Sequence, residues 1–194
     1  MKEIFERRSV RKFAAREVEA EKLEAVLRAG MAAPSAGNQR PWEFYIVRDR
    51  EKLEALSTLS RYAGPVAAAP LAIVTVCAPE GKRFAEVAAT DMAACTENLW
   101  LGAVSEGLGT VWIGVYPYEE RVNFTNQILG IPAGKYVFSI LPLGYPAEEK
   151  TAEDPLTPLG FMSFEAKTKE KQGFNNANFV KYISKKSKEF INSN

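Results

Sequence analysis

The chain has 194 residues, 46% hydrophobic and 25% charged, which is enough to bury a core, and its net charge of +1 gives no electrostatic case for binding nucleic acid or a membrane surface. It contains no histidine and two cysteines, Cys77 and Cys95, which excludes Ser–His and Cys–His catalysis and a zinc site of the usual kind. We expect no signal peptide and no membrane span, and the few cysteines fit a reducing cytoplasm.

The hydrophobic pattern predicts helices and strands in alternation. In chain order, we expect helices over residues 2–7 and 18–31, a strand over 42–48, a helix capped by Asp49, a buried strand over 70–77, a long buried helix over 85–108, a strand over 109–117, a helix over 118–129 and a last strand over 136–146. Alternation alone favours a doubly wound parallel α/β sheet. The segment EGLGTVW lacks the third glycine of a dinucleotide-binding loop and precedes a strand, so that fingerprint fails.

The composition changes near residue 150. All eleven arginines precede residue 151, whereas residues 151–194 carry seven lysines and five asparagines. We therefore predict one domain over 1–150 and a C-terminal extension over 151–194. The extension either packs elsewhere, for example on a partner subunit, or has a different origin from the domain.

The segment RRSVRKF brings four cationic side chains together near the N-terminus. Arginine presents a planar fork of donors that matches phosphate oxygens, and a serine hydroxyl adds one more hydrogen bond. Arg7, Arg8, Ser9 and Arg11 are therefore a candidate site for a small anion such as a monophosphate. Taken alone, the segment is better interpreted as a solvated charged patch at the end of a helix.

Turn-forming residues dominate a second segment, PSAGNQRPW. Gly37 can adopt a positive φ, and Ser35 and Asn38 can donate and accept hydrogen bonds at the edge of a planar, polar heterocycle. Taken alone, this segment is better interpreted as a connector between a helix and a strand, with Trp42 in the core.

Two further segments contain a glycine and are candidates for contact with a ligand. In GTVWIGVYP, the N–H groups of Ile113 and Gly114 can point at a bound ring, although a core strand with a bulge is the stronger interpretation. In LPLGYPAEEK, Gly144 helps to turn the chain and Lys150 can reach an anion, although a surface turn explains the same residues.

The long helix adds no catalytic pair of carboxylates. We expect Asp91 and Glu97 to form capping or interhelical hydrogen bonds, and Trp100 and Trp112 to lie in the core or in an interface. No catalytic side chain and no metal ligand set is predicted.

Each motif is weak alone, but together RRSxRxF, PSAGNQRPW, GLGTVWIG and LPLGYP, in this order and spacing, resemble the FMN-dependent nitroreductase family. The resemblance covers about residues 1–150. It implies an α+β fold with a mostly antiparallel sheet flanked by helices, in place of the parallel sheet. It also implies an intertwined homodimer with FMN at the subunit interface and the helix over 85–108 at its centre.

The resemblance also implies a set of cofactor-binding residues. These are Arg7, Arg8, Ser9, Arg11, Pro34, Ser35, Ala36, Asn38, Ile113, Gly114, Gly144 and Lys150. The first four would hold the FMN phosphate and ribityl chain, and the next four would come from the other protomer and line the isoalloxazine ring. Ile113 and Gly114 would lie near flavin N5, and the last two near the phosphate. Family members often carry an arginine after the GYP turn, where this sequence has only Lys150.

The implied activity is the transfer of a hydride from NADH or NADPH, through flavin N5, to a nitroaromatic, quinone or similar acceptor in a ping-pong cycle. Hydride transfer needs no protein base, so the lack of histidine is no obstacle. The choice of NADH or NADPH and the physiological acceptor stay open. One alternative is a specialised flavin enzyme, such as a dehalogenase. Another is a flavin- or ligand-binding module without turnover.

Overall fold

The computed structural model describes residues 1–148, so Lys150 and the extension predicted over 151–194 lie outside the described residues. The elements are, in chain order, α1 (Lys2–Glu6), α2 (Ala20–Met31), the 3₁₀ turn η1 (Ala36–Asn38), β1 (Trp42–Val47), α3 (Arg50–Ser57), α4 (Pro65–Ala68), β2 (Leu71–Cys77), the 3₁₀ turn η2 (Ala85–Val87), α5 (Ala88–Ser105), β3 (Gly109–Thr110), β4 (Ile113–Gly114), α6 (Glu119–Leu129) and β5 (Tyr136–Gly144).

All pairings between the named strands are antiparallel, in the order β1-β2-β5-β3 with β4 also beside β5. The parallel sheet favoured by alternation is therefore wrong, and the mostly antiparallel α+β fold implied by the resemblance is confirmed. The register gives the reason, because Val47 at the end of β1 lies opposite Ala72 at the start of β2. The chain between these strands leaves and re-enters the sheet at the same end, as in a long hairpin, and makes no crossover.

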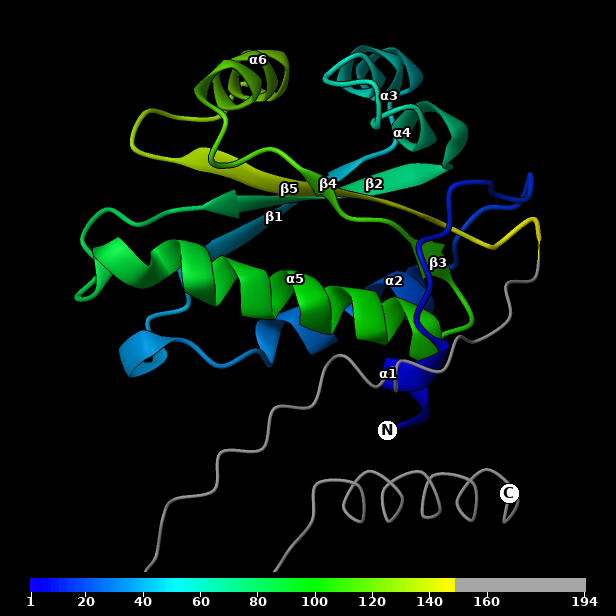
Figure 1. The fold of residues 1–194 in the computed structure, drawn as a ribbon, viewed down its shortest axis with the longest axis horizontal. Helices are drawn as coiled ribbons and strands as arrows, with labels where there is room; N and C mark the ends of the chain where they lie inside the picture. Colours follow the sequence, from blue (N-terminus) through cyan, green and yellow to red (C-terminus); the bar gives the residue numbers. More distant parts are fainter. Residues whose placement is uncertain (149–194) are drawn as a thin grey trace, which may run out of the picture. The chain divides into compact units, whose positions relative to one another are not determined.

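Helices cover both faces of the sheet (Figure 1). α2 and α5 lie on one face, and α3, α4 and α6 lie on the other. The core on the α5 side contains Met92 and Leu99, and the core on the opposite side contains Leu53 and Leu56. All residues of β2 are buried, as its continuous apolar run predicts. Within residues 1–148, no helix is long and apolar enough to cross a membrane.

The ends of the helices follow the local sequence. Asp49 accepts a hydrogen bond from Lys52 N at 2.9 Å, which confirms the predicted cap of α3. Gly130 ends α6 in the left-handed conformation, with a φ of 65°. The helix predicted over 85–108 begins with η2 and continues as α5.

The strand predicted over 109–117 is present only as two short pieces, β3 and β4. Both pieces keep one register along β5, so they form a single path whose pairing is interrupted at Val111 and Trp112. This path carries the chain along the edge of β5 to Gly114.

α2 packs closely against α5 through two glycines. A Cβ atom at Gly30 would lie 2.6 Å from Leu99 Cδ2, and one at Gly102 would lie 2.7 Å from Ala29 Cβ. Both distances are too short for a carbon contact, so larger residues would force the helices apart. Asn98 Nδ2 also donates to Ala29 O at 3.1 Å. Because α2 is fixed in this way, the loop that follows it is held beside the beginning of α5.

Candidate functional site

The N-terminal segment around RRSVRKF lies along the edge of the sheet. Val10 N donates to Thr110 O at 2.9 Å, and Ala14 N donates to Tyr145 O at 2.8 Å. Ser9 forms a parallel bridge with Thr110. The segment therefore follows β3 and the end of β5 through isolated bridges, and its predicted phosphate-binding residues lie beside the β3–β4 path.

Two glycines allow this segment to approach the sheet. A Cβ atom at Gly109 would lie 2.7 Å from Val10 Cβ. One at Gly144 would lie 2.8 Å from Pro70 Cδ and 3.1 Å from Phe13 Cδ1. Gly144, which the sequence placed near a bound phosphate, thus lies under the segment that carries the arginines, and its packing alone accounts for a glycine at this position.

The arginines of the segment point in different directions. The Arg7 guanidinium lies 4.3 Å from the centre of the buried Trp100 ring, and its Nε is 3.7 Å from Glu97 Oε1. Arg7 is therefore turned onto α5, where the aromatic face attracts the cation. Arg8 Nη1 donates to Arg7 O at 2.6 Å, and the Arg11 side chain is exposed.

A polar cluster clamps the chain after this segment to the end of the sheet. Tyr145 Oη donates to Glu19 Oε2 and Arg16 Nη2 donates to Glu19 Oε1, both at 2.6 Å. The Arg16 guanidinium also lies 3.8 Å from the centre of the Tyr145 ring. The hydrogen bond from Tyr145, together with backbone N–H groups and Arg16, lowers the pKa of Glu19 from 4.5 to about 2.

Gly114 presents open backbone at the edge of the sheet. Val115 N donates to Phe138 O at 3.2 Å, so the alternation of an antiparallel ladder turns the N–H and C=O of Gly114 away from β5. Arg121 Nη1 donates to Gly114 O at 3.0 Å. Within residues 1–148, a Cβ atom at Gly114 would meet no atom within 4 Å, whereas the Ile113 side chain is buried. The Gly114 N–H therefore points away from β5, and the space beside the Gly114 Cα is open among the described residues.

The loop with the PSAGN motif has an unusual backbone. Gly37, Asn38 and Arg40 have φ values of 54°, 58° and 47°. Positive φ is the expected use of Gly37 and is tolerated by asparagine, but it is strained for Arg40. Arg40 N donates to Ser35 Oγ at 3.0 Å, and Arg40 Nε donates to Asn38 Oδ1 at 2.9 Å. The predicted ring-binding residues Ser35 and Asn38 are thus held by Arg40.

Asp91 anchors this loop to the first turn of α5. Its Oδ1 accepts from Ala36 N at 2.9 Å and its Oδ2 accepts from Gln39 Nε2 at 2.7 Å. The predicted hydrogen bonds of Asp91 are present, but they hold the loop of residues 36–39 and are not a helix cap. Gln39 was missed by sequence reasoning, although it belongs to the PSAGNQRPW motif, because nothing in the sequence shows which side chains of a loop point inward.

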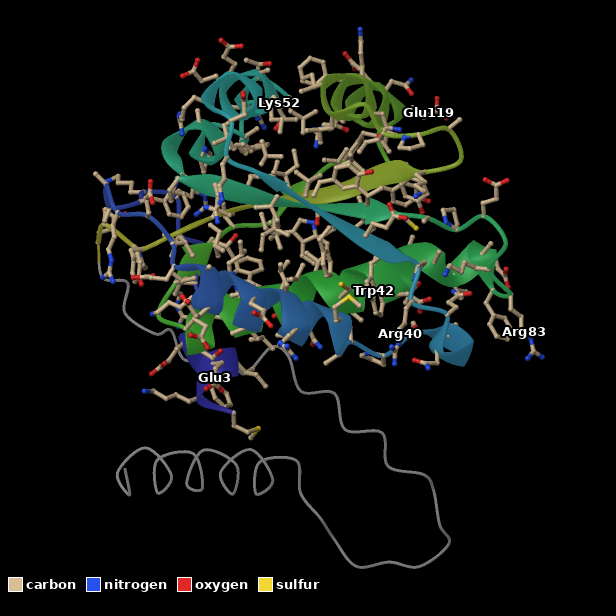
Figure 2. All side chains as sticks on the ribbon, turned by 180° about the vertical axis from the view of Figure 1, so that it is seen from behind. Glu3, Arg40, Trp42, Lys52, Arg83 and Glu119 are labelled. Atoms are coloured by element: carbon tan, nitrogen blue, oxygen red, sulfur yellow. The ribbon has the colours of Figure 1, made fainter. Side chains whose placement is uncertain are left out.

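The predicted site residues form two groups at opposite ends of α5. Asp91 holds the PSAGN loop and Trp100 contacts Arg7, and nine residues of helix separate these contacts by about 14 Å. Figure 2 shows Arg40 at one end of the helix layer and Glu3, in α1, at the other. One chain therefore brings Arg8, Ser9 and Gly114 to the same edge of the sheet, but it leaves the PSAGN loop apart from them.

Neither cysteine is suited to nucleophilic catalysis. Cys77 and Cys95 are both free and buried. Burial raises the pKa of the Cys95 thiol to about 12, and burial also raises the pKa of Cys77. Both side chains are therefore thiols at neutral pH, not reactive thiolates.

Known proteins resemble this fold and this sequence. The pattern of the Nitroreductase family matches residues 4–79 and 66–145, so the chain belongs to the nitroreductase family. A protein of Archaeoglobus fulgidus, provisionally named NADH dehydrogenase/NAD(P)H nitroreductase, is 41% identical over 162 residues, which cover 81% of this chain and 93% of that protein.

Two solved structures are similar in fold as well. A protein of Clostridium acetobutylicum, provisionally named NADH oxidase, has a TM-score of 0.77 and 42% identity over 80% of this chain and 94% of its own. The FMN-dependent nitroreductase of Clostridium difficile R20291 has a TM-score of 0.73 and 34% identity over 80% of this chain and 92% of its own.

We predict that Glu19→Gln destabilises the protein at neutral pH and loses this effect in acid. A lowered pKa in the folded state means that Glu19 contributes stability fully above pH 4.5, and the contribution disappears as the pH falls from 4.5 through about 2. Melting temperatures of wild type and variant across this range measure the difference. Glu24→Gln, which removes an exposed ion pair on α2, is the control and should have little effect. A gap between wild type and Glu19→Gln that stays constant with pH would contradict the prediction.

Proposed function

We propose that the chain is an FMN-dependent oxidoreductase that passes electrons from NADH or NADPH to a nitroaromatic, quinone or similar acceptor. The observation that carries this proposal is the common position of the arginine segment and of the open Gly114 backbone. Ser9 bridges Thr110, and Gly114 follows four residues later on the same path along β5. Family membership supports the proposal, and the unpaired thiols of Cys77 and Cys95 suit the cytoplasmic location that we propose with it.

The phosphate end of the site suits a doubly charged anion. Arg8, Ser9 and Arg11 would bind the FMN phosphate and ribityl chain, with Lys150 from beyond the described residues. Arg7 is turned onto Trp100 and would contribute one edge of its guanidinium while it fixes the segment on α5. Gly144 would act indirectly, because its lack of a Cβ lets Phe13 seat the segment on the sheet.

The ring end of the site suits a flat heterocycle. Space free of atoms around a Gly114 Cβ and an outward N–H would let a ring edge approach the backbone and accept a hydrogen bond. When bound, FMN supplies the redox chemistry, exchanging a hydride at N5 with the nicotinamide and then passing electrons to the acceptor in a ping-pong cycle. The chain binds and orients the partners, which is why it needs no histidine.

We also propose that a second copy of the chain completes the site. Pro34, Ser35, Ala36 and Asn38 would reach the ring from the partner of a homodimer, because one chain holds this loop at the far end of α5 from Arg7. Exposed apolar residues on α1 support an interface there, since Ile4 is 54% and Phe5 46% exposed. The extension over 151–194 would pack on the partner subunit.

The first test of the function is a visible absorbance spectrum of the purified protein. We expect a flavin spectrum, either as purified or after addition of FMN, that bleaches under anaerobic NADPH or NADH because the bound flavin is reduced. The nucleotide that bleaches it faster is the donor. A protein that stays colourless after incubation with FMN would overturn the proposal.

Gly114→Ala should separate folding from cofactor binding. The added Cβ meets no atom of the described residues within 4 Å, so the free energy of unfolding should stay within about 0.5 kcal/mol of wild type. The same methyl group occupies the space proposed for the ring, so the Kd for FMN should rise at least about tenfold. Gly64→Ala, also in open space but beside α4, is the matched control and should change neither quantity. Unchanged FMN binding in Gly114→Ala would place the ring elsewhere.

A mixed dimer tests whether the partner contributes to the site. One subunit carries Arg8→Ala with Arg11→Ala, and the other carries Asn38→Gly, which removes the side chain but keeps the positive φ accessible. Each parent homodimer should bind FMN weakly at both sites. The purified mixed dimer should recover one of its two sites, because one intact arginine segment then faces one intact loop. Recovery of neither site would mean that both groups act within one subunit.

A further inference from the structure

Asp91 is a buried carboxylate whose partners are unusual. Only 6% of the residue is exposed, and no ion pair found within residues 1–148 includes it. Its hydrogen bonds go to a backbone N–H and to an amide group, those of Ala36 and Gln39. Burial of a carboxylate is costly without strong hydrogen bonds, and a carboxylate that accepts such bonds holds its donors firmly. Both donors belong to the loop proposed to line the flavin ring.

Gln39 extends this anchor to a second loop. Its Oε1 accepts from Phe84 N and its Nε2 donates to Phe84 O, both at 3.0 Å. The amide thus pairs with a peptide group on both sides, in the manner of a neighbouring strand. The Phe84 ring then covers Gly37, where a Cβ atom would lie only 2.7 Å from Phe84 Cε2. Asp91 and Phe84 therefore both hold the loop, Asp91 through Ala36 and Gln39 and Phe84 through Gln39 and Gly37.

The loop held in this way is strained. Asn38 and Arg40 both adopt positive φ, a region that side chains with a Cβ disfavour. Such backbone persists only where the surroundings over-determine it, and it occurs often at ligand-binding sites. Gln39 lies between these two residues and Ala36 lies two residues before Asn38, so the hydrogen bonds of Asp91 and Gln39 constrain the backbone on which they stand.

We infer that Asp91 is a positioning residue, which together with Gln39 presets the loop of residues 34–40 in the conformation that meets the flavin. The inference rests on the proposed function. Asp91 touches the loop and not the cofactor, so its effect is on affinity. A loop ordered in advance binds without the entropy cost of ordering it, and a released loop must pay that cost on every binding event.

The test compares cofactor affinity with turnover in Asp91→Ala, Asp91→Asn and Gln39→Ala. We expect Asp91→Ala and Gln39→Ala to raise the Kd for FMN at least about tenfold, and Asp91→Asn, which keeps one acceptor for Ala36 N, to lie between them and wild type. At saturating FMN, kcat should stay within about twofold of wild type, because the bound geometry is restored. A merely structural role would raise the Kd for FMN and lower kcat together.

The control is a second carboxylate that also accepts a hydrogen bond from a backbone N–H but lies far from the loop of residues 34–40. Asp49 also accepts a backbone N–H at 2.9 Å, but it caps α3 on the opposite face of the sheet. Asp49→Ala should lower the melting temperature and leave the Kd for FMN unchanged. If Asp49→Ala weakened FMN binding as much as Asp91→Ala, a general loss of stability would explain both and the inference would be overturned.

A reversal of polarity tests the contact between the two side chains directly. Gln39→Glu sets a carboxylate against that of Asp91, so it should weaken FMN binding more than Gln39→Ala does. When Asp91→Asn is added to Gln39→Glu, the new asparagine amide can donate to the new glutamate carboxylate. The double variant should therefore bind FMN more tightly than Gln39→Glu alone, although Asp91→Asn alone weakens binding relative to wild type. Additive losses in the double variant would show that the pair does not act through this contact.

Hydrogen exchange without cofactor separates this inference from the proposed function. The N–H groups of Ala36 and Phe84 should exchange faster in Gln39→Ala and Asp91→Ala, while the amides in the middle of α5 stay protected. Unchanged exchange at both groups would overturn the inference, whatever the flavin result.

If wild type binds no FMN, the proposed function fails and exchange still decides whether the anchor presets the loop. If Asp91→Ala does not fold, Gln39→Ala, at a partly exposed position, gives the same readouts.

Discussion

The close contact between α2 and α5 is the constraint on which both parts of the candidate site depend. Gly30 and Gly102 let the two helices touch, with Leu99 and Ala29 filling the space that larger residues would need. The contact fixes where α2 ends, and the PSAGN loop begins there. α5 then offers Asp91 to that loop at one end and Trp100 to the arginine segment at the other. A single buried helix thus sets the spacing between two groups of residues that are far apart in the sequence.

The edge of the sheet supplies the second constraint. β3 would be an exposed edge, but the N-terminal segment covers it through Val10 and Ser9. Gly109 makes this approach possible because any Cβ there would collide with Val10. The same pairing that protects the edge therefore carries Arg8 and its neighbours to the path that leads to Gly114. The contacts that cover the edge of β3 are therefore the same contacts that position the residues proposed to bind the phosphate.

Local features of the fold were predictable because they depend on few residues. The Asp49 cap and the buried β2 follow from a side chain and an apolar run. The direction of the strands was not predictable from alternation, because it depends on the end of the sheet at which the chain returns after Val47. The antiparallel sheet was predicted only through the resemblance, because the order and spacing of the four motifs are characteristic of a family that shares one fold. The contact of Arg7 with Trp100 was missed for a similar reason, because it requires the position of α5 across 93 residues of chain.

The hydrogen bonds of the PSAGN loop also explain why its polar side chains suit a ring rich in acceptors. Arg40 N–H occupies the Ser35 oxygen and Arg40 Nε–H occupies the Asn38 oxygen. Each oxygen then has one lone pair in use, while the Ser35 hydroxyl proton and the Asn38 Nδ2 protons can be donated to a ligand. On the buried side of the loop, Asp91 of α5 accepts hydrogen bonds from Ala36 N and Gln39 Nε2, so its carboxylate has hydrogen-bond donors there. Donors without charge are therefore left for the ligand side, while the arginines meet the anionic end. The proposed ligand, with a phosphate at one end and a neutral, oxygen- and nitrogen-rich ring at the other, would meet each group with the chemistry that it offers, once a second copy of the chain brings the two groups together.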